Sequence, residues 1–393
     1  MAIERITERV TSVGAQDWHR RLFDELIPLP EGTSYNAYLV KGSNATALID
    51  TVDPTKEREL LSNLNRLGIN RIDYVISHHG EQDHSGAIPA ILQAFPEALV
   101  VTNAKCKNML QELLLVPDEK FKVISNEETL SLGDLTLQFF DMPWVHWPET
   151  MVTLLKEEEI LFSCDFFGSH LASSSLFEEI DEAVISSAKR YFAEIMMPFS
   201  STIRNHLKKV RELSPRMIAP SHGPVHKDPS VIIGQYENWT SNVKKPVVLV
   251  PFVSMHGSTR AMVEHLVDAL SERQVKVKPF DLTVADIGEL AINLVDSAVL
   301  VLGVPTVLGG PHPVALHAAT LVNALRPTIP YVTMIGSYGW GGNTEGVVKD
   351  SLKNLKTELL TPVMIKGHPE EPAFDELEKL ADEIASKCKQ LSN

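Results

Sequence analysis

The chain has 393 residues, of which 44% are hydrophobic and 22% charged, a composition typical of a globular protein with two or three domains. Its formal net charge of −15 argues against a nucleic-acid-binding protein, because phosphate backbones are bound by clustered lysines and arginines. The three cysteines, Cys106, Cys164 and Cys388, lack C-x-x-C spacing, which argues against a disulfide framework and against a cysteine-bound metal centre.

The first residues, MAIERITERV, lack the basic-then-apolar pattern of a signal peptide. No apolar run approaches the roughly 18 residues of a membrane helix. Unpaired cysteines are typical of a reducing compartment. We therefore expect a cytoplasmic protein that spans no membrane.

The first half of the chain is predicted to be rich in strands. Short apolar or alternating runs separated by turn residues predict strands at 35–40, 46–50, 73–77, 98–103, 121–125, 135–142, 151–156 and 160–165. Helical periodicity lies between some of them, at 55–68 and 87–95. Many strands with interspersed helices predict an α/β sandwich.

The pattern changes near residues 238–245, where we place the boundary between a domain of residues 1–245 and one of residues 246–393. The run 246–253 is continuously apolar, as expected of a strand buried on both faces. Strands at 275–280, 297–304 and 329–338 then alternate with helices at 259–274, 285–295, 313–325 and 343–355. This alternation predicts a doubly wound parallel sheet.

The densest chemical segment directly follows the predicted strand 73–77. Within residues 78–84, five side chains can bind a metal: His78, His79, Glu81, Asp83 and His84. A polar loop that caps the next helix through Asp83 or Ser85 is the simpler alternative. Because a cap needs only one such residue, the segment favours a metal site.

Three further candidates also follow predicted strands, so that loops gather at one edge of a sheet. The full candidate set is His79, Glu81, Asp83, His84, His146, Asp165 and His222. Zinc usually takes four ligands rich in Cys and His. Seven ligands with three carboxylates instead suit two metals that share a bridge, and Asp165 could be that bridge. Mixed imidazole and carboxylate ligands are compatible with iron and with other divalent ions.

Three loops of the second half leave the carboxyl ends of strands, where open α/β sheets bind ligands. Small residues between a strand and a helix can hold a phosphate, although an ordinary capped helix explains the first loop equally well. Neither the nucleotide-binding pattern G-x-x-x-x-G-K-[ST] nor G-x-G-x-x-G is present. Aromatic residues of the third loop could stack on a flat ring or pack internally. The candidate residues are Ser254, Met255, His256, Gly257, Ser258, Thr259, Pro305, Thr306, Val307, Leu308, Gly309, Ser337, Tyr338, Gly339, Trp340 and Gly341.

The pattern H-x-E-x-D-H of residues 79–84, followed by His146, Asp165 and His222, resembles the diiron centre of A-type flavodiiron proteins, which have the metallo-β-lactamase fold. Hydrolases of that superfamily carry His where this chain has Glu81. The resemblance implies one iron held by His79, Glu81 and His146, and another held by Asp83, His84 and His222, with Asp165 bridging. In some members the residue matching His84 does not bind metal directly.

The resemblance covers nearly the whole chain and implies a metallo-β-lactamase-like αββα sandwich at 1–245, with two non-haem irons. A flavodoxin-like domain would follow at 246–393 and bind flavin mononucleotide (FMN). Trp147 and Asp24 are implied to be residues of the diiron pocket. Some relatives have His at the position of Asp24, so their substrate preference does not transfer to this chain. We interpret His78, His170 and His226 as neighbours of ligands or as surface histidines.

The activity implied is reduction of dioxygen to water, of nitric oxide to nitrous oxide, or of both, with electrons transported through FMN to the diiron centre. The implied donor is rubredoxin or a reduced deazaflavin coenzyme. A head-to-tail homodimer is implied, which could pair again into a tetramer. The main alternative is a zinc hydrolase of the metallo-β-lactamase type with a flavodoxin-like module, and Glu81 argues against it. A non-catalytic electron carrier is a third class, and the complete ligand set disfavours it.

Overall fold

The computed structural model describes residues 3–177 and 181–391. The chain divides into two compact units, Met1–Phe192 with Phe199–Thr240, and Ser241–Asn393 with Ala193–Pro198. None of the helices in the described ranges combines the length and the apolar character needed to cross a membrane. The domain boundary after residue 245 stays a prediction.

The first unit contains two stacked β-sheets. The larger sheet runs in the order β1 (Glu4–Arg5), β2 (Val10–Ser12), β7 (Tyr38–Lys41), β8 (Thr46–Ile49), β9 (Tyr74–Ile76), β10 (Leu99–Thr102) and β11 (Phe121–Val123). From β8 to β11 its strands are parallel. The smaller sheet runs in the order β12 (Thr129–Ser131), β13 (Thr136–Asp141), β14 (Met151–Leu155), β15 (Ile160–Cys164) and β16 (Met217–Pro220).

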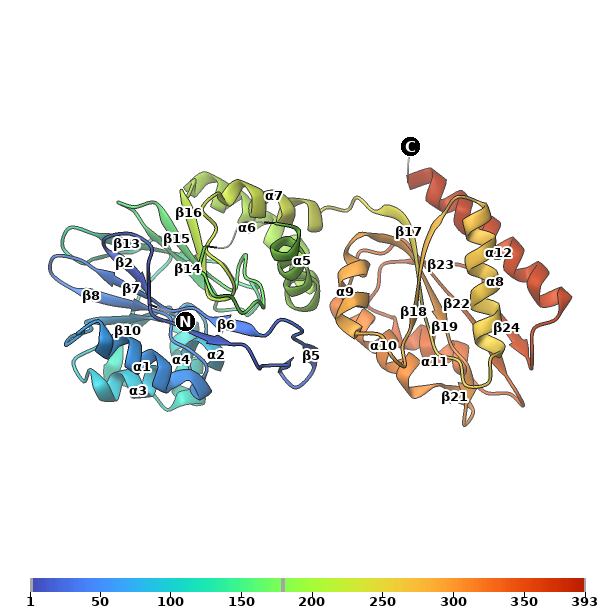
Figure 1. Cartoon of the computed structure of the whole chain (residues 1–393), viewed down its shortest axis with the longest axis horizontal. Coiled ribbons are helices and arrows are strands. Elements are labelled where there is room, and N and C mark those ends of the chain that lie inside the picture. The colour runs from blue at the N-terminus through green and yellow to red at the C-terminus, as the bar shows by residue number, and fades with distance from the viewer. Residues whose placement is uncertain (1–2, 178–180, 392–393) are drawn as a thin grey trace. The chain divides into compact units, whose positions relative to one another are not determined.

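Helices cover the outer faces of both sheets (Figure 1). On one side lie α1 (Glu57–Arg66), α2 (Gln82–Ser85), α3 (Ile88–Ala94) and α4 (Ala104–Leu114). On the other lie α5 (Glu182–Tyr191), α6 (Ser200–Leu213) and α7 (Pro229–Trp239). Two short hairpins, β3 (Ala15–Asp17) with β6 (Thr33–Tyr35) and β4 (Leu22–Phe23) with β5 (Ile27–Pro28), complete the unit. The predicted αββα sandwich is therefore confirmed.

Period-two alternation explains these layers, because successive residues of a strand face opposite sides of its sheet. In β8, Ile49 packs into the core between the two sheets, whereas Leu48 packs into the core under the helices. In β13, Leu137 and Phe139 enter the core between the sheets and are fully buried. The central strands therefore have an apolar side chain on both faces.

The second unit is a parallel sheet in the order β18 (Lys276–Asp281), β17 (Lys245–Phe252), β19 (Ser297–Gly303), β22 (Tyr331–Tyr338) and β23 (Glu358–Leu359), with β24 (Val363–Lys366) also paired to β22. Helices α8 (Ser258–Glu272) and α12 (Glu371–Leu391) lie on one side (Figure 1). Helices α9 (Ile287–Asp296), α10 (Pro313–Leu325) and α11 (Thr344–Ser351) lie on the other. The predicted doubly wound sheet is confirmed, in a flavodoxin-like strand order.

We predict that Leu137→Ala destabilises the first unit by about 2–5 kcal/mol, because it removes a fully buried side chain from the core between the sheets. The measurement is the free energy of unfolding in urea, followed by tryptophan fluorescence. Leu113→Ala on α4 is the control, because Leu113 is 45% exposed, and it should change the stability by less than about 0.5 kcal/mol. Equal effects of the two substitutions would contradict this description of the core.

We also predict that His226 makes the metal-free protein sensitive to acid. The His226 backbone pairs with Ile218, and its Nε2 donates to the Phe167 carbonyl oxygen at 3.0 Å. Burial lowers the pKa of this imidazole to about 4. Between about pH 6.5 and pH 4 the unfolded chain therefore binds a proton at His226, whereas the folded chain does not. The free energy of unfolding falls as the pH drops through this range. The loss is about 3 kcal/mol.

The variant His226→Gln keeps a side-chain donor for the Phe167 carbonyl but does not titrate. Its urea midpoint should fall less than that of the wild type between pH 7 and pH 4.5. Parallel pH profiles of the two proteins would show that His226 does not carry the effect.

Candidate metal centre and flavin site

The structure brings together all seven side chains predicted to bind metal. They stand in loops that follow β9, β13, β15 and β16, where the carboxyl ends of these strands meet. Glu81 directly precedes the four-residue helix α2, which carries Asp83 and His84. His146 lies between β13 and β14. Asp165 directly follows β15, and His222 follows β16 after one intervening residue.

A first group consists of His79, Glu81 and His146. Oε2 of Glu81 lies 3.0 Å from Nε2 of His79 and 3.1 Å from Nε2 of His146. Oδ2 of Asp165 lies 3.5 Å and 3.7 Å from the same two nitrogens. The four side chains are compact enough to hold one metal ion.

A second group consists of Asp83, His84 and His222. Nε2 of His222 lies 3.0 Å from Oδ2 of Asp83, and Nε2 of His84 lies 3.3 Å from Oδ1 of the same carboxylate. Oδ1 of Asp165 lies 2.8 Å from Nε2 of His84 and 3.5 Å from Nε2 of His222. The two oxygens of Asp165 therefore face different groups, which is the arrangement that a bridging carboxylate requires.

The hydrogen bonding of these atoms fits metal binding. Among the described residues, both oxygens of Asp83, both ring nitrogens of His84 and Oδ2 of Asp165 are buried without a hydrogen-bond partner. His84 and Asp165 are close in distance but not aligned as a hydrogen bond. Buried polar atoms without partners are costly. Convergence of these atoms on metal ions would remove that cost.

The charges in the site depend on one another. Burial opposes ionisation of Asp165, yet the neighbouring imidazoles of His84, His79 and His146 hold the pKa of this carboxyl well below its usual range. Burial also opposes protonation of His84, but Asp165 and Asp83 raise its pKa to about 10. Metal binding would therefore displace protons from the imidazoles.

Three groups that orient the candidate ligands were not predicted from the sequence. Oε1 of Glu149 accepts hydrogen bonds from His79 Nδ1 at 2.7 Å and from the Gly80 amide at 3.0 Å. Nδ1 of His222 donates to the Ser34 carbonyl oxygen at 2.6 Å, and the Tyr191 hydroxyl donates to Oδ1 of Asp165 at 2.7 Å. Such bonds fix ligand orientation around a metal. Their partners are distant in sequence, and no local pattern marks them.

The three remaining histidines near the site are not surface residues. His78, His170 and His226 are all buried. His78 lies between Asp50 Oδ2 and Thr153 Oγ1, at 2.7 Å from each, while His170 Nδ1 lies 2.9 Å from the Thr33 hydroxyl. The alternative of surface histidines is therefore wrong, because each ring has a polar partner within the fold.

The two predicted pocket residues differ in their surroundings. The Trp147 ring lies edge-on to His79, with ring centroids 4.7 Å apart. Asp24 is exposed and directly follows β4 in the β4–β5 hairpin. Its pKa is raised because nearby protein atoms partly displace water from its carboxyl group, and because Glu81 and Asp83 are negatively charged.

A cavity of about 180 Å³ lies at the carboxyl ends of the strands in the second unit. Among the sixteen residues predicted to contact FMN, those that line it are Ser254, Met255, His256, Ser258, Thr259, Pro305, Thr306, Ser337, Tyr338 and Gly339. Gly367, which was not predicted, also lines it. The cavity wall does not include Gly257, Val307, Leu308, Gly309, Trp340 or Gly341.

The local backbone suits a phosphate and a flat ring. Gly257 has a φ of +90° and precedes the first turn of α8, whose free N–H groups attract an anion. The hydroxyl and glycine residues at this helix end therefore fit a flavin phosphate. Leu308 and Trp340 are 94% and 80% exposed, so Trp340 does not pack inside this chain.

Comparisons with known proteins agree with this geometry. A family model described as ODP family beta lactamase matches residues 33–223. The nitric oxide reductase of Moorella thermoacetica is 34% identical over 363 residues, which are 90% of either chain. The coenzyme F420H2 oxidase of Methanothermobacter marburgensis is 32% identical over 401 residues, covering 98% of this chain and 99% of that one.

Among solved structures, the rubredoxin oxygen:oxidoreductase from the anaerobe Desulfovibrio gigas superimposes with a TM-score of 0.95 at 27% identity, over 99% of both chains. The similarity thus includes both units as well as the ligand-bearing loops. The chain belongs to the flavodiiron protein family.

Proposed function

We propose that this protein reduces dioxygen to water, nitric oxide to nitrous oxide, or both, with electrons from a small redox donor. The observation that carries the proposal is the pair of buried ligand groups with one oxygen of Asp165 facing each. Relatives named nitric oxide reductase, coenzyme F420H2 oxidase and rubredoxin oxygen:oxidoreductase support it. Their names also suggest rubredoxin or a reduced deazaflavin as the donor.

We assign His79, Glu81 and His146 to one iron and Asp83, His84 and His222 to the other, with Asp165 between them. A diiron centre with open positions, fed with electrons by FMN, would supply the redox chemistry. The residues that would hold FMN are those that line the cavity at the start of α8, a helix labelled in Figure 1. The three buried free cysteines suit a reducing compartment, and we propose a cytoplasmic location.

The protein's own groups prepare this site before any substrate arrives. Glu149 and the Ser34 carbonyl fix the rings of His79 and His222, so these two ligands are oriented before substrate binds. The Tyr191 hydroxyl donates to Asp165 and therefore reduces the negative charge that this carboxylate presents. Because the ligands other than Glu81 and His146 are buried, bulk water is largely excluded, which strengthens every electrostatic interaction inside.

The zinc hydrolase alternative is not favoured. Glu81 contributes an anionic oxygen to the first group, whereas zinc sites of that superfamily have a histidine at this position. The flavin-type cavity in the second unit has no role in hydrolysis.

The first experiment compares the wild type with Glu81→Ala by elemental analysis, visible spectrum, and anaerobic reduction followed by dioxygen or nitric oxide. We expect about two irons and one FMN in the wild type. Glu81→Ala should lose iron and reductase activity but keep FMN, because its defect lies in the first unit. Glu97→Ala, an exposed residue between α3 and β10, is the control and should behave as the wild type.

Wild-type turnover in an iron-depleted Glu81→Ala protein would overturn the ligand assignment. Two zinc ions without flavin, in wild-type protein produced with ample iron and flavin, would overturn the redox function.

We further propose a head-to-tail homodimer that places the flavin site of one subunit against the diiron site of the other. Large apolar side chains are exposed beside both sites. In the first unit, Trp144 lies two residues before His146, and Leu26 lies in the β4–β5 hairpin with Asp24. In the second unit, Met255 lines the flavin cavity, and Leu308 and Trp340 lie in loops predicted to contact FMN. Apolar exposure of this kind is typical of an association surface.

We predict that Leu308→Glu shifts the sedimenting species from dimer towards monomer, because it places a charge in the apolar interface, and that it slows oxidation of the reduced flavin by dioxygen. Leu113→Glu on α4 is the matched control and should stay dimeric. A strictly monomeric wild type with full turnover would refute the dimer.

A further inference from the structure

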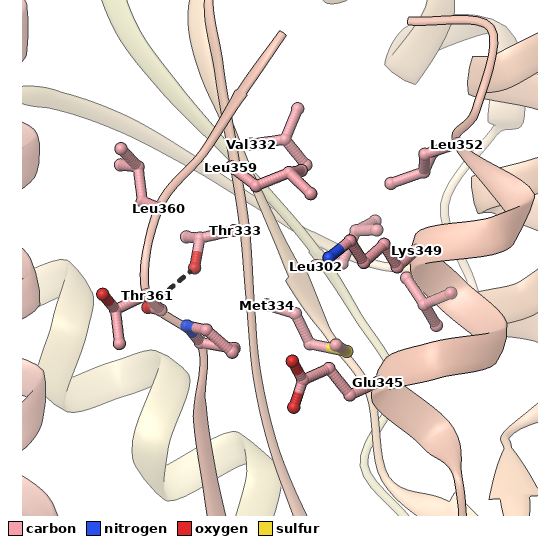
Figure 2. A pocket seen from close by; sticks show the side chains of 12 residues that line it. Leu302, Val332, Thr333, Met334, Glu345, Lys349, Leu352, Leu359, Leu360 and Thr361 are labelled. Atoms are coloured by element: carbon pink, nitrogen blue, oxygen red, sulfur yellow. Dashed lines mark hydrogen bonds between the residues drawn. The ribbon is translucent and has the colours of Figure 1, made fainter.

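The second unit contains a cavity that the flavin site does not use. It has a volume of about 260 Å³ and lies between α11 and the strands β19, β22 and β23 (Figure 2). Its walls are mainly apolar, from Leu302, Val332, Met334, Val348, Leu352 and Leu360. At about 30 Å³ for each water molecule in the liquid, it has room for a molecule about as large as an aliphatic amino acid.

A break in the edge strand forms one wall of this cavity. Val332 pairs with Leu359, and Ile335 pairs with Val363, so the edge strand has one residue more than β22 between these two pairs. The extra residue is a bulge. The Thr333 hydroxyl donates to the Thr361 carbonyl oxygen at 3.1 Å and holds the bulged segment in place. The cavity is therefore built into the sheet.

Two opposite charges stand at the rim. Glu345 and Lys349 lie one turn apart on α11, and both side chains extend from the helix towards the strands (Figure 2). A glutamate four residues before a lysine is well placed for an ion pair along a helix. Yet among the described residues neither side chain forms a hydrogen bond or an ion pair, with the other or elsewhere. Each charge is thus available to a ligand.

We propose that this cavity binds a free α-amino acid with an aliphatic side chain, such as leucine or methionine. The apolar side chain would occupy the space among Val332, Met334 and Leu360. The carboxylate would pair with Lys349 and the ammonium group with Glu345. A zwitterion with a short apolar body satisfies both charges and the apolar walls together. A fatty acid would leave Glu345 opposed to its carboxylate.

The site adjoins the flavin cavity through α11. Thr344, which precedes Glu345, has its hydroxyl 2.6 Å from that of Thr306, a residue of the flavin cavity wall. An amino acid at the rim would therefore lie one residue away from a contact of the flavin loops. The site goes beyond the proposed function and does not depend on it.

The test is a saturation-transfer NMR titration of the full-length protein with L-leucine and L-methionine. We expect saturable binding. Two leucine analogues separate the charges: 4-methylpentanoate lacks the ammonium group, and 3-methylbutylamine lacks the carboxylate. Each should bind about tenfold more weakly than L-leucine, as expected for the loss of one hydrogen-bonded ion pair.

The variants Glu345→Gln and Lys349→Gln should each weaken L-leucine binding about tenfold. Lys353→Gln, which removes an exposed lysine two residues beyond the end of α11, should leave it unchanged. The proposal is overturned if neither amino acid gives saturable binding, or if binding is unchanged in both Glu345→Gln and Lys349→Gln. Reductase activity does not enter the test, so its outcome is separable from that of the proposed function.

Discussion

The carboxylate of Asp165 is the constraint on which the proposed metal site depends. It is buried, negatively charged, and faces imidazoles of both ligand groups. A buried charge of this kind is tolerated only when opposite charges or metal ions compensate it. The surrounding fold is arranged accordingly: β15 ends directly before Asp165, and Tyr191 of α5 donates a hydrogen bond to its Oδ1.

The second unit follows a different physical rule. Its proposed flavin site would use the partial positive charge of the free N–H groups at the start of α8, where the metal site uses charged side chains. Gly257 allows the chain to turn sharply from β17 into α8 with a positive φ. The two units thus have separate hydrophobic cores, and each would bind a different kind of cofactor.

Much of this organisation could be predicted from the sequence. The residues predicted to bind metal follow apolar strands at the same kind of position, and four of them lie within residues 79–84, so local pattern was enough to predict that they would converge. The orienting groups were not predictable, because Glu149, Tyr191 and Ser34 meet their partners only after the two sheets stack. The strands β23 and β24 have two and four residues, too few for periodicity to show, and Gly367 at the flavin cavity was missed for this reason.

Each ligand group draws on both sheets of the first unit. His79, Glu81, Asp83 and His84 follow β9 of the larger sheet, whereas His146, Asp165 and His222 follow strands of the smaller one. A metal ion in either group would therefore be a cross-link that closes a chain loop of more than fifty residues, as a disulfide does in secreted proteins. The three cysteines are unpaired, so the metal would provide the cross-link between the sheets that no disulfide provides. The stability of the sandwich would then depend on the supply of metal.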